Sequence, residues 1–188
     1  MMGTMSRNYK FQNERGVYFV SFSVVQWIDV FTRVEYRDIV LDILRFLCLN
    51  KGLEIFGWCI MTNHVHLVYR SIGLHRPEII LATLKRFSSR KLIEAIQSNP
   101  VESRREWLLS RFQAAAHQSS NVSRFQFWRH DNHPIELWSP AVIDEKLEYV
   151  HNNPVEAGWV LQPEHYLYSS AIDYAGGQGL LEGVIVIR

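Results

Sequence analysis

The sequence predicts an α+β fold of the ferredoxin-like kind: a β-α-β-β-α-β antiparallel sheet with helices on one face, followed by a C-terminal helix. Three observations predict it. Short runs rich in aromatic and β-branched residues alternate with longer stretches of helical periodicity. The second and third short runs are separated by only three residues, which favours a hairpin. The composition, 47% hydrophobic and 21% charged over 188 residues, is typical of a single globular domain.

The first half of the chain is expected to form three strands and one helix. Aromatic and β-branched residues predict a strand over 16–25. Over 34–52, apolar residues recur near helical spacing, and the segment closes on Lys51–Gly52, a common helix stop. Two further strands are predicted over 53–60 and 64–70, joined as a hairpin.

The second half is expected to form helices and one last strand. The segment 77–100 opens with proline and closes on Asn-Pro, which predicts a helix of about six turns. The segment 101–121 is interpreted as another helix or as a mobile insertion. The run FQFWRH (125–130) predicts the fourth strand. A helix over 139–153 is expected to begin with Ser139 as its N-cap and proline at its first position.

No part of the sequence suggests export or membrane insertion. The N-terminal residues lack an apolar signal region, and no run approaches the about 20 apolar residues of a membrane span. We therefore expect a cytoplasmic protein with no membrane partner.

Two histidines, His64 and His66, lie two residues apart on a predicted strand. Strand periodicity points both toward one face, whereas Val65, Leu67 and Tyr69 point toward the other. The apolar set is expected to face the core, leaving the imidazoles on the opposite face. There they are about 6–7 Å apart along the strand, close enough to bend toward one metal ion. A pair of surface histidines is the plainer interpretation, because so short a motif is weak evidence.

The helix over 139–153 offers a third ligand. Tyr149 and Asn153 lie four residues apart, and therefore one turn apart on the same helical face. An amide oxygen beside two imidazoles suits Mg²⁺ or Mn²⁺. Two plainer interpretations stay open. Asn153 precedes Pro154, which disfavours helical geometry and suits an N-cap, and Tyr149 can be an ordinary tyrosine at the edge of the core.

Four ordered motifs, MTNHVHLV, FWRHDNHPIEL, LEYVHNNPVEAGWV and PEHYLYSSAIDY, resemble those of a known family. The chain resembles the single-tyrosine transposases of the HUH superfamily, most closely the REP-associated tyrosine transposases of the insertion-sequence-200-like kind. The resemblance runs from about Tyr9 to Tyr174. It favours one catalytic domain over residues 1–188.

The resemblance implies a metal-dependent enzyme that binds single-stranded or hairpin DNA. It would cut and rejoin that DNA through a 5′-phosphotyrosine intermediate. By motif matching, Tyr149 is the nucleophile, and His64, His66 and Asn153 hold Mg²⁺ or Mn²⁺. Some relatives work as monomers and others pair two chains, so a homodimer stays open.

Charge is unevenly distributed along the chain. Residues 76–130 carry 10 Lys and Arg against 4 Asp and Glu, whereas residues 131–188 carry 2 against 9. A basic central third suits a polyanion such as DNA, although a solvated helix face would look the same. The cations that we expect to contact DNA phosphates are Arg86, Arg90, Lys85, Lys91 and Arg129.

Two other functions stay open at this point. The protein could be a structured-DNA-binding protein that has lost catalysis, or a metal-dependent nuclease in which water attacks and Tyr149 only orients it. A covalent protein–DNA adduct would distinguish the tyrosine transesterase from both.

Overall fold

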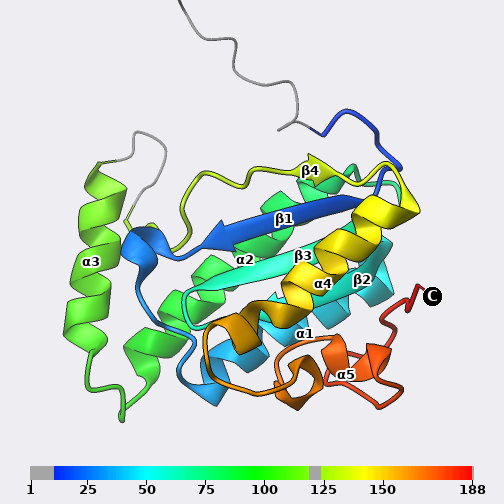
Figure 1. Cartoon of the computed structure of the whole chain (residues 1–188). Helices are drawn as coiled ribbons and strands as arrows, with labels where there is room; N and C mark the ends of the chain where they lie inside the picture. Colours follow the sequence, from blue (N-terminus) through cyan, green and yellow to red (C-terminus); the bar gives the residue numbers. More distant parts are fainter. Residues whose placement is uncertain (1–10, 119–123, 188) are drawn as a thin grey trace, which may run out of the picture.

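The computed structural model describes residues 11–118 and 124–187 (Figure 1). The strands are β1 (Tyr18–Ser23), β2 (Leu53–Ile60), β3 (His64–Ser71) and β4 (Ile135–Glu136). The longer helices are α1 (Val34–Lys51), α2 (Pro77–Ser98), α3 (Arg105–His117) and α4 (Pro140–Glu156). Short helical segments are η2 (Val25–Trp27), η3 (Pro163–His165) and α5 (Ala171–Tyr174). Across these described residues, no helix is both long and apolar enough to span a membrane.

Within the described residues the strands form a four-stranded sheet in the order β2-β3-β1-β4. Each neighbouring pair is antiparallel, and β2 and β3 form the predicted hairpin. The two β-α-β crossovers place β1 and β3 at the centre of the sheet, which is the ferredoxin-like arrangement. The predicted α+β fold is therefore confirmed.

Helices cover both faces of this sheet. Figure 1 shows α1 and α2 behind it and α4 crossing in front of it. Val65, Leu67 and Tyr69 belong to the large core cluster that also contains the apolar residues of α1 and α2. Val68 points the other way and packs with residues of α4 in a second cluster. The predicted directions of the side chains on β3 are confirmed, since the alternation of a strand separates the two sets.

The helix α4 begins after Ser139, whose Oγ accepts a hydrogen bond from a backbone N–H in the first turn, as predicted for an N-cap. It continues through Pro154, so the interpretation of Asn153 as the N-cap of a new helix is wrong. Pro154 is buried, and the N–H of Ala157 donates to the Asn153 carbonyl at 3.0 Å. This packing offsets the hydrogen bond that proline cannot make. Asn153 therefore stays one helical turn from Tyr149.

The fourth strand was predicted over 125–130, and this prediction is wrong. That segment makes only an isolated bridge, between Trp128 and Val24, and the ladder with β1 is formed later in the chain by β4. Phe127 and Trp128 are buried, and both rings contact Phe31. Their alternation therefore reflects burial in the core and does not come from a strand ladder.

Of the two interpretations of the segment 101–121, the helix is the one observed, as α3. Residues 119–121 lie outside the described residues. A buried carboxylate fixes the start of α3: Glu102 accepts hydrogen bonds from Nε of Arg33 at 2.7 Å and from Nε of Arg104 at 3.4 Å. Because Arg33 directly precedes α1, this contact ties the start of α3 to the start of α1.

Candidate active site

The two histidines face each other at the start of β3. Their Nε2 atoms are 3.0 Å apart and their ring centroids 4.6 Å apart. His66 is 3% exposed and stacks on Phe19 of β1, whereas His64 lies closer to the edge of the sheet. The pair is therefore not a pair of surface histidines, because His66 is buried and His64 is half-buried beneath α4.

Both imidazoles are neutral near pH 7. Burial and, to a lesser extent, the neighbouring His64 lower the pKa of His66 to about 3, although the side chain of Asn153 opposes the shift. Burial also lowers the pKa of His64, against the hydrogen bond of Asn153 and the charge of Asp29. A neutral imidazole keeps a lone pair on one ring nitrogen, which is the form that binds metal ions.

The tautomer of His64 is set by the residue before it. The amide nitrogen of Asn63 donates to Oδ1 of Asp29 at 3.0 Å and to the carbonyl of Trp27 at 3.3 Å. The amide oxygen of Asn63 therefore faces Nδ1 of His64, at 2.7 Å, and that nitrogen must carry the proton. Nε2 of His64 is left with its lone pair pointing toward His66.

Tyr149 lies over the histidine pair. Its ring makes edge contacts with His66 and Phe19, at centroid distances of 5.3 and 5.8 Å, and it is 42% exposed. The helix α4 can approach the sheet closely because β2 has Gly57 there: a Cβ at this position would lie 2.5 Å from Cδ2 of Leu147. Tyr149 thus combines a ring held by the site with a side chain that solvent, and so a substrate, can reach.

Asn153 completes the group. Its side chain lies close enough to both imidazoles to raise their pKa values against the effect of burial, and its amide nitrogen donates to the backbone carbonyl of Tyr149 at 3.3 Å. The structure therefore brings together all four residues that the sequence placed in the catalytic and metal sites: Tyr149, His64, His66 and Asn153.

This donor set fits a divalent cation. The two Nε2 atoms lie 3.0 Å apart, a hydrogen-bond distance that also brings both nitrogens close enough to share one ion. The Asn153 amide supplies an oxygen donor beside them. Among the described residues no group of three His, Cys, Asp or Glu side chains is suited to a metal. Asn153 as a third ligand stays a prediction.

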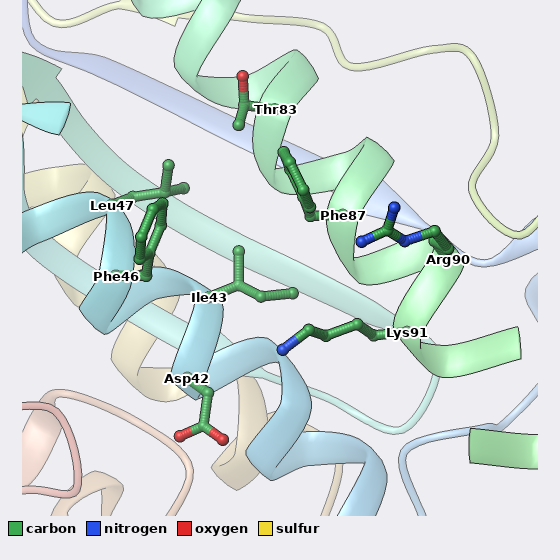
Figure 2. Close-up of a pocket in the computed structure, with 8 residues that line it drawn as sticks. All are labelled: Asp42, Ile43, Phe46, Leu47, Thr83, Phe87, Arg90 and Lys91. Atoms are coloured by element: carbon green, nitrogen blue, oxygen red, sulfur yellow. The ribbon is translucent and has the colours of Figure 1, made fainter. Parts of the chain in front are cut away.

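The five cations expected to contact DNA occupy two separate places. Arg86, Arg90 and Lys91 are exposed on α2. Figure 2 shows Arg90 and Lys91 beside an apolar groove between α1 and α2 that includes Phe46 and Phe87. This groove lies in the α1–α2 layer, whereas the histidines are on the other face of the sheet, beneath α4. A role of these three in DNA binding stays a prediction.

Lys85 and Arg129 lie nearer the histidines. Nζ of Lys85 donates to the carbonyl of Arg129 at 2.6 Å and also to the side chain of Asn132. Burial lowers the pKa of Lys85 to about 8, against the charge of Asp131. Lys85 thus holds the segment that precedes β4 in place, and the Arg129 guanidinium lies over the ring of Trp27. Their contacts with DNA stay predictions as well.

Sequence reasoning missed three residues of this site: Asn63, Asp29 and Trp27. Asn63 carried a signal, because it directly precedes the histidine pair in TNHVH. Asp29 and Trp27 carried none, since they lie more than thirty residues earlier and reach the site only through the fold.

Comparison with known proteins agrees with this geometry. A family model described as "Transposase IS200 like" matches residues 22–124. The structure of a REP-associated tyrosine transposase bound to a REP hairpin covers 100% of this chain and 99% of its own, with a TM-score of 0.63 and 13% sequence identity. This likeness shows a shared fold.

A candidate transposase from Deinococcus radiodurans covers 80% of this chain and 97% of its own, with a TM-score of 0.45 and 19% identity. No curated protein matches the chain.

Proposed function

This chain belongs to the IS200-like transposase family, and we propose that it cuts and rejoins single-stranded DNA beside a hairpin, with Tyr149 as the nucleophile. The observation that carries the proposal is the position of Tyr149, held edge-on against His66, whose Nε2 lies 3.0 Å from Nε2 of the second neutral imidazole, His64. Neither a surface tyrosine nor a structural histidine pair requires this arrangement.

The proposed step is a transesterification. The Tyr149 oxygen forms a bond to phosphorus while the bond from phosphorus to the 3′ oxygen breaks. The phenol proton passes to solvent and the leaving 3′ oxygen takes one up, which leaves a 5′-phosphotyrosine and a free 3′-hydroxyl. Because one phosphodiester replaces another, the reaction is reversible and rejoining needs no nucleotide cofactor.

The residues that would hold Mg²⁺ or Mn²⁺ are His64, His66 and Asn153. Such an ion supplies charge neutralisation and polarisation of the phosphate. The protein itself contributes to the reaction by holding these groups in position. Asn63 holds the ring of His64, burial keeps His66 neutral, and α4 places Tyr149 and Asn153 one turn apart above both.

Hairpin DNA is the proposed substrate for a specific reason. The neighbour of the same fold over its whole length was solved bound to a REP hairpin. A site open to solvent on the sheet face beneath α4 suits an unpaired strand better than a continuous duplex, since the scissile phosphate must reach the recessed His66.

The test is covalent capture. The protein is incubated with labelled single-stranded hairpins and Mg²⁺ or Mn²⁺, and a denaturing gel is examined for label that migrates with the protein. We expect an adduct with the wild type that is lost in Tyr149→Phe and on addition of a chelator. Tyr36→Phe is not a suitable control because Tyr36 is buried. Tyr174→Phe is the control, because the Tyr174 hydroxyl donates to the Phe56 carbonyl and its ring contacts His151 instead of the histidine pair; this variant should retain the adduct.

Each outcome selects one function. Cutting without an adduct, undiminished in Tyr149→Phe, would show that water is the nucleophile and would overturn the proposal in favour of a nuclease. Binding without cutting in metal-loaded protein would support a DNA-binding protein that has lost catalysis.

A further inference from the structure

A second feature adjoins the histidine pair, a cleft between η2 and α3. Its volume is about 580 Å³, and the residues that line it are Gln26, Trp27, Ile28, Asp29, Arg104, Trp107 and Arg111. Figure 1 shows η2 and α3 side by side at the end of the sheet where β1 ends. His64, at the start of β3, pairs with the last residue of β1 at this same end. The cleft thus opens directly beside the candidate active site.

Trp27 connects the cleft with the site. Its ring lies 5.8 Å from that of His64 and its side chain is 53% exposed. The guanidinium of Arg129 lies over the same ring, 5.6 Å from its centroid. An exposed aromatic ring beside a cation suits a nucleic-acid base. The flat face of the base can stack on the ring, and the cation can contact the neighbouring phosphate.

The backbone beneath Trp27 is held in an unfavourable conformation. Gln26 and Trp27 both have φ of 56°, in the left-handed region that side chains rarely adopt. The N–H of Trp27 donates to the carbonyl of Val24 at 3.1 Å, and the amide of Asn63 donates to the carbonyl of Trp27 at 3.3 Å. A strained backbone conformation that hydrogen bonds hold in place is typical of a functional site. Here this conformation keeps the side chain of Trp27 exposed.

The other wall of the cleft comes from α3. Trp107 is 45% exposed, and the guanidinium of Arg111 lies 5.7 Å from its ring centroid. Arg104 donates to the carbonyl of Asp29 at 2.8 Å, which fastens the start of α3 to the loop after η2. Arg104 and Arg111 line the cleft, Arg129 lies over Trp27, and the one carboxylate among the lining residues, Asp29, already accepts a hydrogen bond from Asn63. Arg104 is also paired with Glu102, and Arg129 with Asp131.

We propose that this cleft binds the unpaired nucleotides next to the phosphodiester held at the histidine pair. One base stacks on Trp27, and the phosphates that follow lie against Arg111 and Arg129. The inference rests on the proposed function, because it places the strand of the same substrate. It also assigns a role to α3, which is to complete the single-strand site.

The experiment compares two DNA molecules in the Tyr149→Phe background, so that cutting does not interfere. One is a blunt hairpin, and the other is the same hairpin with a single-stranded extension on either side that carries 2-aminopurine. We expect Trp27→Ala to weaken binding of the extended hairpin by about 5- to 100-fold, the usual effect of losing one base stack. Binding of the blunt hairpin should change by less than about 2-fold.

Further variants separate stacking from folding. Trp27→Phe keeps an aromatic ring and should retain most of the affinity, whereas Trp138→Ala removes an exposed tryptophan before α4 and should have no effect. Quenching of 2-aminopurine on binding is expected for the wild-type ring and should be lost in Trp27→Ala, because quenching reports stacking itself.

Two results would overturn the inference, and they are distinguishable. Equal affinity and equal quenching in Trp27→Ala, in a protein that does bind the extended hairpin, would remove the cleft from the DNA site while leaving the proposed function intact. A folded protein that binds neither DNA molecule would overturn the proposed function, and this inference with it.

Discussion

Nδ1 of His64 lies 2.7 Å from the amide oxygen of Asn63, and this contact leaves Nε2 of His64 as the unprotonated nitrogen in the site. Asp29 orients the same amide, so a carboxylate, an amide and an imidazole form a chain of hydrogen bonds. Partners of this kind behind a metal ligand fix its tautomer and ring orientation. Asn63 is therefore a positioning residue.

Replacing Asn63 should weaken the site without unfolding the protein. We expect Asn63→Ala to raise the Mn²⁺ concentration needed for half-maximal adduct formation by about 10- to 100-fold, since the ring of His64 loses its fixed orientation. Adduct yield titrated against Mn²⁺ measures this. Asn50→Ala, at the exposed end of α1, is the matched control, and a titration curve that coincides with the wild type would exclude Asn63 from this role.

The DNA contacts predicted for the exposed arginines of α2 can be tested by measuring how DNA affinity depends on salt concentration. Each phosphate contact to a single strand contributes about 0.7 to the slope of log affinity against log salt. The double variant Arg86→Gln, Arg90→Gln should therefore flatten that slope by about 1.4 and weaken binding to unrelated single strands. Arg15→Gln, Arg76→Gln removes the same charge elsewhere and serves as the control. An unaltered slope would mean that DNA does not reach α2.

The buried His151 should make stability depend on pH. Burial lowers its pKa to about 4, and Nε2 of its ring lies 2.8 Å from Oγ of Ser170. As pH falls from about 6.5 to about 4, the unfolded chain gains a proton that the folded chain does not, so stability falls by up to about 3 kcal/mol.

The measurement is urea unfolding at pH 7 and pH 4.5 for the wild type and His151→Gln. Burial also lowers the pKa of His64 and of His66, so both add to the loss of stability on acidification. Both proteins keep these two residues, so the difference between the proteins isolates His151. The variant should lose less stability on acidification, whereas the exposed His75→Gln should behave as the wild type. Equal losses in all three would contradict the burial effect.

The carboxylate of Glu102 should hold α3 in place. Its side chain is fully buried and accepts from Arg33 and Arg104, and these hydrogen bonds and charges lower its pKa although burial opposes them. We expect Glu102→Gln to lower the free energy of unfolding by about 2 kcal/mol, the usual contribution of hydrogen bonds to a charged group. Thermal unfolding measures this, with the exposed Glu106→Gln as control. Similar losses in the two variants would show that the contact contributes little.

Much of the fold was predictable because it depends on local spacing. Helix-terminal signals gave the bounds of α1 and α2 closely, and β2 and β3 were separated correctly by their short turn. The fourth strand was misplaced because Phe127 and Trp128 alternate like strand residues while being buried by Phe31, which is distant in sequence. The helix α4 was drawn too short because Pro154 breaks helices in general and is accommodated here by burial.

By itself, the sequence determined which residues could share a face: the two histidines by strand alternation, and Tyr149 with Asn153 by helical periodicity. Both follow from the periodicity of side-chain directions within one strand or one helix. Only the tertiary structure decided that α4 lies over the histidine face, that Asp29 reaches Asn63, and that Trp27 and Trp107 share a cleft. These relationships join segments far apart in the chain, and they exist only because the sheet and its two helical layers pack together.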